Sequence, residues 1–136
     1  MKNLKTILSV LFLALSVNSC IDRDILEEKV GVILPTVTDL KYTIQNGEDI
    51  TLHWSIPSVI PSEMQRPLSV YIQVFRGTTL EYQISLPNEP TTWNFKVVNP
   101  ENDHRIVVKL QGSLKEKGYG MSDDIYSLGQ TVAVKF

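Results

Sequence analysis

Asp49–Pro57 reads DITLHWSIP, and apolar and polar side chains alternate along it. Ile50, Leu52 and Trp54 share one parity, and the polar residues between them share the other. A period of two is typical of a β-strand with one face on a core, because successive side chains point to opposite faces. Pro57 has no amide hydrogen to donate, so it ends the strand. The segment therefore predicts a strand that buries a tryptophan.

Six further segments of the sequence show the same alternation, at residues 36–44, 68–75, 80–86, 92–97, 104–110 and 130–136. The breaks between the segments are rich in turn-forming residues. Asn46-Gly47 is a strong hairpin signal, and other breaks contain proline, asparagine or aspartate. No helical period and no internal repeat stands out after Pro35. Seven short strands in about 100 residues predict a single antiparallel β-sandwich over residues 35–136.

Val97–Leu110 reads VVNPENDHRIVVKL and resembles a segment of fibronectin type III domains. In that family a hydrophobic residue, a proline and a short polar turn lead into a strand that carries a corner tyrosine. The resemblance implies that Val98 is the hydrophobic plug and Pro100 the turn proline, and His104 stands in the place of the tyrosine. LHWSIP resembles the second strand of the same family. Over residues 35–136 the resemblance implies a fibronectin type III-like, all-β fold.

The N-terminal residues have the features of a secretory signal peptide. Lys2 and Lys5 form a short positive head. Ile7–Val17 follows as an apolar run interrupted only by two serines. A membrane-spanning helix needs about 20 apolar residues, so this run is too short to span a bilayer. Its length instead suits the apolar region of a signal peptide.

Cys20 is the single cysteine of the chain and ends the motif VNSC, which resembles the lipobox of bacterial lipoproteins. The resemblance implies that residues 1–19 are a removed signal peptide and that Cys20 is acylated on its thiol and on its new amino terminus. Two acyl signals anchor a protein stably, whereas a single chain binds marginally. We therefore expect contact with the membrane through this N-terminal lipid, followed by a flexible tether, with the lipidated cysteine and tether together spanning residues 20–34.

The tether is acidic, with Asp22, Asp24, Glu27 and Glu28. Acidic residues soon after the cysteine resemble the signal that sends Bacteroidota-type lipoproteins to the cell surface; a solvated linker is the alternative. The whole chain resembles the small uncharacterised lipoproteins of that group, and that family implies no particular activity. The expected location is the outer membrane, at the cell surface, with its periplasmic face as the alternative.

The charge and the cysteine usage exclude several function classes. The formal net charge is −2, and removal of Lys2 and Lys5 with the signal peptide makes it −4. No cluster of Lys and Arg stands out, so we expect no nucleic-acid partner. Acylation of Cys20 would leave no thiol for a disulfide, an iron–sulfur cluster or a cysteine nucleophile. We expect no cofactor.

The sequence contains no recognisable catalytic motif. His53 and His104 are the only histidines, and they lie on different predicted strands. No two histidines have metal-ligand spacing, and no serine nucleophile motif occurs, so we do not expect an enzyme. Asp123 and Asp124 are a weak calcium candidate, because clustered carboxylates bind hard cations. They lack the spacing and central glycine of an EF-hand loop, so a calcium-binding module or a hydrolase is the less favoured class.

Aromatic residues provide the candidates for partner binding. Trp54 and Trp93 share parity with apolar neighbours, so the pattern favours core packing over a carbohydrate platform. Tyr71, Gln73 and Phe75 have the opposite parity to their core-facing neighbours. Apolar residues on an exposed sheet face often mark a contact surface. The alternative is that the tether or a neighbouring strand covers them.

Tyr119 and Met121 are the second candidates, since they lie in a glycine-flanked loop and binding residues often lie on loops. Together these observations predict an envelope-anchored, non-enzymatic accessory module that binds a protein or a glycan. A structural spacer subunit of a surface assembly is the alternative.

Overall fold

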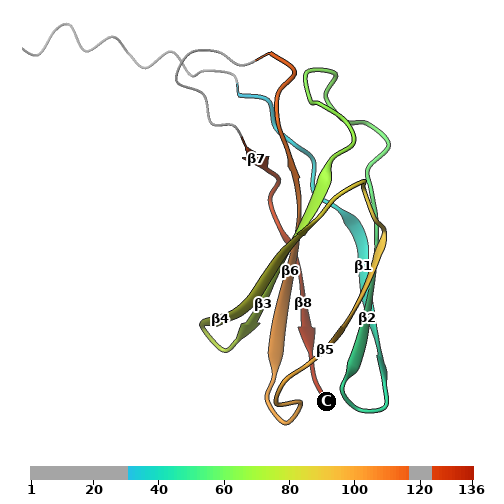
Figure 1. The fold of residues 1–136 in the computed structure, drawn as a ribbon, viewed down its shortest axis with the longest axis vertical. Coiled ribbons are helices and arrows are strands. Elements are labelled where there is room, and N and C mark those ends of the chain that lie inside the picture. The colour runs from blue at the N-terminus through green and yellow to red at the C-terminus, as the bar shows by residue number, and fades with distance from the viewer. Residues whose placement is uncertain (1–30, 117–123) are drawn as a thin grey trace, which may run out of the picture. The chain divides into compact units, whose positions relative to one another are not determined.

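The computed structural model describes residues 31–116 and 124–136, and every regular element in these two ranges is a β-strand. The strands are β1 (Thr38–Gln45), β2 (Asp49–Ser55), β3 (Ser69–Arg76), β4 (Thr79–Leu86), β5 (Thr92–Lys96), β6 (His104–Gly112), β7 (Ile125–Tyr126) and β8 (Gln130–Val134). Short connections join most of them (Figure 1). Within the described ranges no helix is long and apolar enough to cross a membrane.

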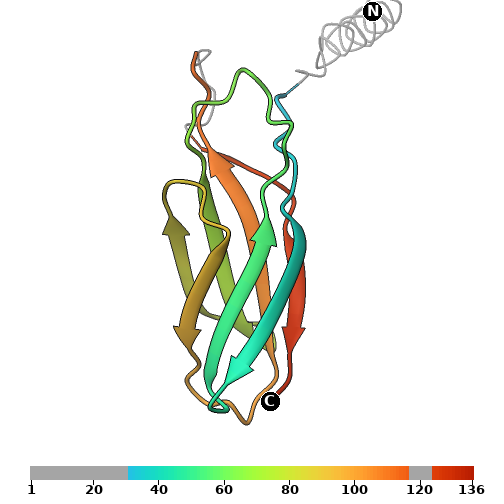
Figure 2. The same cartoon turned by 90° about the vertical axis from the view of Figure 1, so that its right-hand side faces the viewer.

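The strands form two antiparallel sheets that face each other (Figures 1 and 2). One sheet has the order β1-β2-β5, and the other has the order β4-β3-β6-β7, with β8 also paired to β6. This arrangement confirms the predicted antiparallel β-sandwich. The described ranges hold one strand more than the predicted seven, because the two-residue β7 precedes β8 and pairs with the same strand.

The β1–β2 hairpin turns at the Asn46-Gly47 pair. Asn46 has a φ of 53° and Gly47 a φ of 75°. A type I′ turn needs positive φ at both central residues, which asparagine and glycine adopt most easily. The amide of Glu48 donates to the carbonyl of Gln45 at 3.3 Å and closes the turn.

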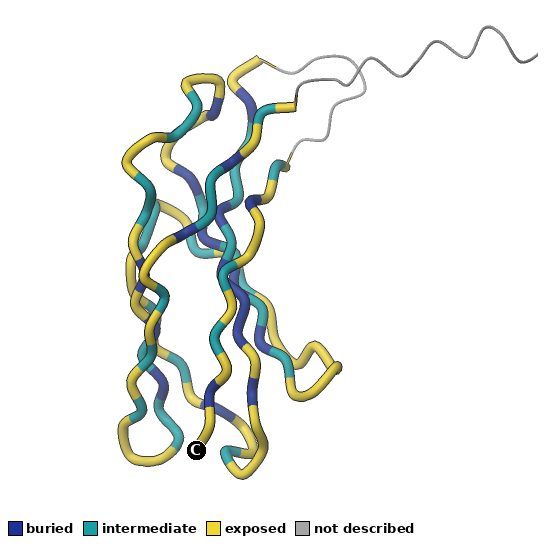
Figure 3. The backbone as a smooth tube through the Cα atoms, turned by 180° about the vertical axis from the view of Figure 1, so that it is seen from behind, coloured by how far each residue is buried: buried dark blue, intermediate teal, exposed yellow. Residues whose placement is uncertain are grey.

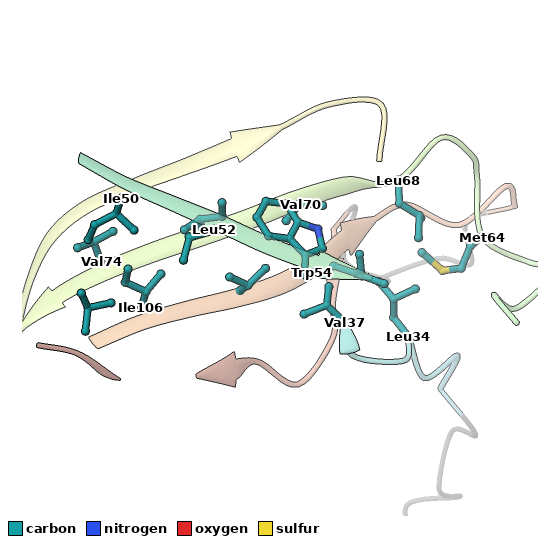
Figure 4. Close-up of a cluster of buried hydrophobic side chains, with 14 of the residues drawn as sticks. Leu34, Val37, Ile50, Leu52, Trp54, Met64, Leu68, Val70, Val74 and Ile106 are labelled. Carbon is teal, nitrogen blue, oxygen red and sulfur yellow. The ribbon is translucent and has the colours of Figure 1, made fainter. Parts of the chain in front are cut away.

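The core lies between the sheets and follows the alternation of the sequence. Figure 3 shows buried and exposed positions alternating along the strands. Figure 4 shows Trp54 near the centre of the buried cluster, together with residues from β2, β3 and β6. Trp54 is 4% exposed, and its indole N–H donates to the carbonyl of Pro90 at 2.7 Å. A buried indole needs such a partner, because an unpaired buried donor is costly.

A bulge in β4 changes which of its residues face the core. Val74 of β3 pairs with Tyr82, whereas Phe75 pairs with Leu80, so Glu81 is the extra residue. The uninterrupted alternation of β4 predicts Leu80 on the core face together with Tyr82. That prediction is wrong: Leu80 lies opposite Phe75 on the outer face and is 41% exposed.

An ion pair joins the connection before β3 to the connection between β4 and β5. Arg66 donates to both carboxylate oxygens of Glu89. The same carboxylate accepts the amide N–H of Leu68 at 2.9 Å. These bonds, with Arg66 as the main cause, lower the pKa of Glu89 below its usual value of about 4.5. The two connections are therefore held together at one end of the sandwich.

Candidate functional site

A groove of about 430 Å³ opens between β4 and β5. Small-molecule sites have volumes of roughly 300–1,000 Å³. The groove lies between the outermost strands of the two sheets. Figure 2 shows these two strands, β4 and β5, on the same side of the sandwich. Its lining is Val74, Glu81, Tyr82, Trp93, Phe95, Lys96, Val97, Val98 and His104.

The topology explains why the groove is open. β4 ends the larger sheet and β5 ends the smaller one, so neither has a further strand beyond it among the described residues. The core-facing side chains of an outermost strand pack against the opposite sheet. They have a neighbouring strand on one side only, and their other side has none. Side chains near this edge therefore remain partly accessible to solvent.

Three aromatic rings form a stack along the groove. The rings of Trp93 and Phe95 are 4.4 Å apart between centroids and 13° from parallel. The ring of Tyr82 lies 5.9 Å from that of Trp93 and is parallel to it within 1°. Offset stacking of this kind contributes roughly 0.5–1.5 kcal/mol per pair beyond area burial. The stack links β4 of one sheet to β5 of the other, and Tyr82 is 46% exposed.

Trp93 packs against the core, as expected, but it is only partly buried. Trp93 and Phe95 pair with Leu52 and Ile50 of β2, which are fully buried, so both aromatic residues have core-facing parity. Both are nevertheless only partly buried, and both line the groove. The cause is position: β2 lies in the centre of its sheet, and β5 lies at the edge.

A polar network forms one end of the groove. Glu81 pairs with Arg76 at 2.9 Å and contacts Nε2 of His104 at 3.1 Å. The other ring nitrogen of His104, Nδ1, lies 2.7 Å from the carbonyl of Asn102. A carbonyl oxygen can only accept, so Nδ1 carries a hydrogen. The His104 side chain is completely buried, and its ring meets that of Phe136 edge-on at 5.8 Å.

Lys96 and Val98 form the rim of the groove. The ammonium group of Lys96 lies 2.5 Å from a carboxylate oxygen of Glu48, and this bond raises the pKa of Lys96. Val98 is 74% exposed, so its predicted role as the hydrophobic plug is wrong. Val97, at 5% exposed, occupies the core instead, because it continues the parity of Phe95.

The lining of the groove suits binding by stacking and hydrogen bonds. Among the described residues that line it there is no serine, threonine or cysteine. Both nitrogens of His104 are already engaged. Within residues 31–116 and 124–136, no three His, Cys, Asp or Glu side chains converge on a common point where a metal ion could bind.

The aromatic row predicted from the sequence lies on the outer face of the larger sheet. Tyr71 packs edge-on against Tyr126, with centroids 5.3 Å apart, and its hydroxyl donates to Gln83 at 2.5 Å. The guanidinium of Arg105 lies 4.2 Å above the ring of Phe75. Tyr71, Gln73 and Phe75 are each half-buried by such neighbours. Their role as a contact surface stays a prediction.

The other predicted residues are scattered. Cys20, Tyr119, Met121 and Asp123 lie outside the described residues. Asp124 is exposed and lines a separate hollow of about 130 Å³. His53 is exposed on β2, in the other sheet from His104. Pro100 lies in the turn before β6, where the resemblance placed it.

The sequence reasoning missed the groove. Trp93 and Phe95 stand two residues apart, so they were predicted to share a face of the same strand. Tyr82 is likewise assigned to the core face by its parity. The alternation does not reveal that β4 is the outermost strand of one sheet and β5 the outermost strand of the other, on the same side of the sandwich. No local signal marks the groove, because charged residues stand beside core-parity residues in other strands too, as Arg105 does beside Ile106.

Comparison with known proteins identifies a family and a fold. A family profile described as "Domain of unknown function (DUF4945)" matches residues 20–134. No curated protein matches the sequence. The structure resembles domains d3–d4 of the rat CD45 extracellular region, with 12% identity, 76% of this chain covered and a TM-score of 0.55. The chain spans about half of that fragment, since 50% of it is covered.

Two further solved structures resemble the chain. A computationally redesigned β-sandwich protein has 15% identity and a TM-score of 0.53, with 75% of this chain and 89% of that chain covered. The fibronectin type III domain of human collagen XX has 17% identity and a TM-score of 0.47, with 74% and 92% covered. At these identities the likeness to the two structures with TM-scores above 0.5 concerns the fold alone, a β-sandwich.

Proposed function

The chain belongs to the family of domains of unknown function DUF4945, and we propose that it is a non-enzymatic binding module held at the cell envelope by a lipid on Cys20. Its binding site is the groove between β4 and β5. A partner bound there is kept near the outer membrane, and the sandwich serves as the rigid scaffold of the site.

The observation that carries this proposal is the open aromatic stack. Leaving apolar surface in water forgoes roughly 25 cal/mol for each Å² that could have been buried. Tyr82 and Val98 keep 46% and 74% of their surface exposed beside the partly buried Trp93. An exposed apolar patch rimmed by polar residues is typical of an interaction site. Glu81 and Lys96 provide that polar rim.

Two observations support the anchor. The VNSC motif at residues 17–20 follows a short apolar run and a positive head. The match of the family profile begins at residue 20, which is Cys20. A chain tethered by lipid needs no membrane-spanning helix of its own.

The two tryptophans allow a direct test of binding. Trp54 is buried in the core, and Trp93 lines the groove. Full-length protein labelled with 5-fluorotryptophan gives one ¹⁹F resonance for each tryptophan. The resonance that disappears in the Trp93→Phe variant belongs to Trp93. We titrate this protein with the polysaccharide fraction and with the protein fraction of the cell envelope.

We expect at least one fraction to move the Trp93 resonance while that of Trp54 stays in place. If neither fraction moves it, the groove is not a binding site, and the spacer alternative is favoured. If both resonances move together, the fraction perturbs the fold rather than filling the groove. The groove is then not a binding site either.

A further inference from the structure

Glu81 and Lys96, the acidic and basic side chains that line the groove, each already have a partner of opposite charge within the protein. The carboxylate of Glu81 forms an ion pair with Arg76, and its second oxygen contacts Nε2 of His104. The ammonium of Lys96 is paired with Glu48, and Asp49 adds a second negative charge near it. A charged ligand would have to compete with these pairs for its counter-charge. The groove therefore favours a neutral ligand.

The aromatic stack selects the shape of that ligand. The face of an aromatic ring carries partial negative charge, and the C–H groups on one side of a pyranose ring carry partial positive charge. A sugar ring can thus lie flat on an exposed aromatic ring, with its hydroxyl groups turned toward polar side chains. Tyr82 ends the stack and is 46% exposed. Each oxygen of the Glu81 carboxylate beside it keeps a lone pair for a sugar hydroxyl after its contact with Arg76 or His104.

A second hollow continues the groove around β5. It has a volume of about 350 Å³, and Phe95 and Lys96 line both hollows. The second hollow adds hydrogen-bonding side chains to the aromatic surface. These are Gln45, Asp49, Thr51 and Asn94. The two hollows together offer stacked rings, amides and a hydroxyl, which are groups that could contact more than one sugar ring.

The bulge in β4 disfavours the main alternative, an extended peptide added to the sheet edge. Strand addition needs a regular row of free backbone groups. The extra residue at Glu81 interrupts that row where the groove lies, and bulges and charged side chains are two devices by which edge strands avoid pairing. Lys96 at the end of β5 acts in the same direction.

We infer that the β4–β5 groove binds a neutral oligosaccharide, with one pyranose ring stacked on Tyr82 and further rings extending past Phe95 toward Asn94. This inference rests on the proposed function and specifies the class of its ligand. The aromatic rings supply affinity, and the amide, hydroxyl and carboxylate groups orient the sugar hydroxyls.

The test titrates the full-length, ¹⁹F-labelled protein with defined probes, in a detergent that has no sugar headgroup. The probes are neutral gluco-, manno-, xylo- and galacto-oligosaccharides of increasing length, a polygalacturonate, a chitosan oligomer and an extended neutral peptide. We expect at least one neutral series to move the Trp93 resonance, with affinity that rises from one sugar ring to several.

Substitutions of two tyrosines that are equally exposed test whether the oligosaccharide contacts Tyr82. Tyr82→Ala should weaken binding of that oligosaccharide about tenfold, and Tyr82→Phe should retain most of it, because the stacking face is kept. Tyr126→Ala is the control, since Tyr126 is also 46% exposed but lies on β7, away from the groove. It should leave the affinity unchanged.

The outcomes distinguish a wrong ligand class from a wrong proposed function. If the envelope protein fraction or the peptide moves the Trp93 resonance and no neutral oligosaccharide does, the groove is a binding site but the glycan assignment is wrong. Tighter binding of the charged polymers, or equal losses in Tyr82→Ala and Tyr126→Ala, also overturns the assignment. If no probe and neither envelope fraction acts on Trp93, the proposed function falls with it.

Discussion

At the scale of single residues, His104 shows how a polar side chain can be structural. It is 2% exposed, and both ring nitrogens have partners, one in the backbone of Asn102 and one in Glu81. Buried polar groups are tolerated when their hydrogen bonds are made. The bond to Asn102 ties the start of β6 to the turn before it, as the resemblance to a corner tyrosine implies.

Replacing His104 by alanine should therefore destabilise the fold. The change leaves a cavity and removes two hydrogen bonds, and we expect a loss of about 2–4 kcal/mol in the free energy of unfolding. Urea denaturation followed by far-UV circular dichroism measures it. His53→Ala is the control, because His53 is exposed on β2 and its removal should change stability by less than about 0.5 kcal/mol. Equal effects of the two substitutions would contradict a structural role for His104.

At the scale of elements, the alternation of the sequence predicts the strands well and their pairing less well. Residues 80–86 alternate without a break, so no local signal reveals the bulge at Glu81. The bulge arises from the register between β3 and β4, where Val74 and Phe75 pair with Tyr82 and Leu80. Register depends on two strands at once, and a single-strand pattern cannot contain it.

The connection between β4 and β5 supports a prediction about pH. Arg66 lowers the pKa of Glu89, so the folded state favours the ionised carboxylate. The ionised Glu89 carboxylate makes its full contribution to the free energy of unfolding above the usual pKa of about 4.5. This contribution is lost as the pH falls below that value toward the lowered pKa of the folded state. Glu89→Gln should cost about 1 kcal/mol near neutral pH, a modest value because the Arg66 side chain is 49% exposed.

The measurement is the melting temperature of both proteins across the acidic range. The difference between wild type and Glu89→Gln should shrink as the pH decreases through about 4.5 and below. Glu101→Gln is the control on the exposed turn before β6. A difference that stays constant down to about pH 2.5 would show that the charge of Glu89 does not stabilise the fold.

At the scale of the whole molecule, the fold class follows from the sequence and the groove does not. Trp54 and Trp93 occupy strands with the same alternation, yet one is buried and the other lines an open groove. The difference comes from the sheet order, in which β2 is central and β5 is outermost. Sheet order is set by pairing between distant segments, whereas alternation and turn residues are local. Local patterns therefore predict a sandwich and leave its open edge unspecified.

The proposed anchor is a property of the whole chain, and Cys20→Ser tests it. Serine replaces the nucleophilic thiol, which would take the diacylglyceryl group, by a hydroxyl, so we expect a chain without lipid. In the producing bacterium, wild-type protein should incorporate labelled fatty acid and sediment with membranes. The mass of its N-terminal peptide should correspond to acylated Cys20. Cys20→Ser should incorporate no label and keep residues 1–19, because cleavage in this pathway follows lipidation.

Ser16→Ala is the matched control, since it leaves the cysteine and the apolar run intact and should be lipidated like the wild type. Protease treatment of intact cells then reports the side of the membrane, with loss of the domain expected if it faces outward. A wild-type chain that begins at a residue other than Cys20, or that carries no acyl group, would remove the anchor from the proposal. The binding role of the groove would remain, because the residues that line it belong to the sandwich and not to the tether.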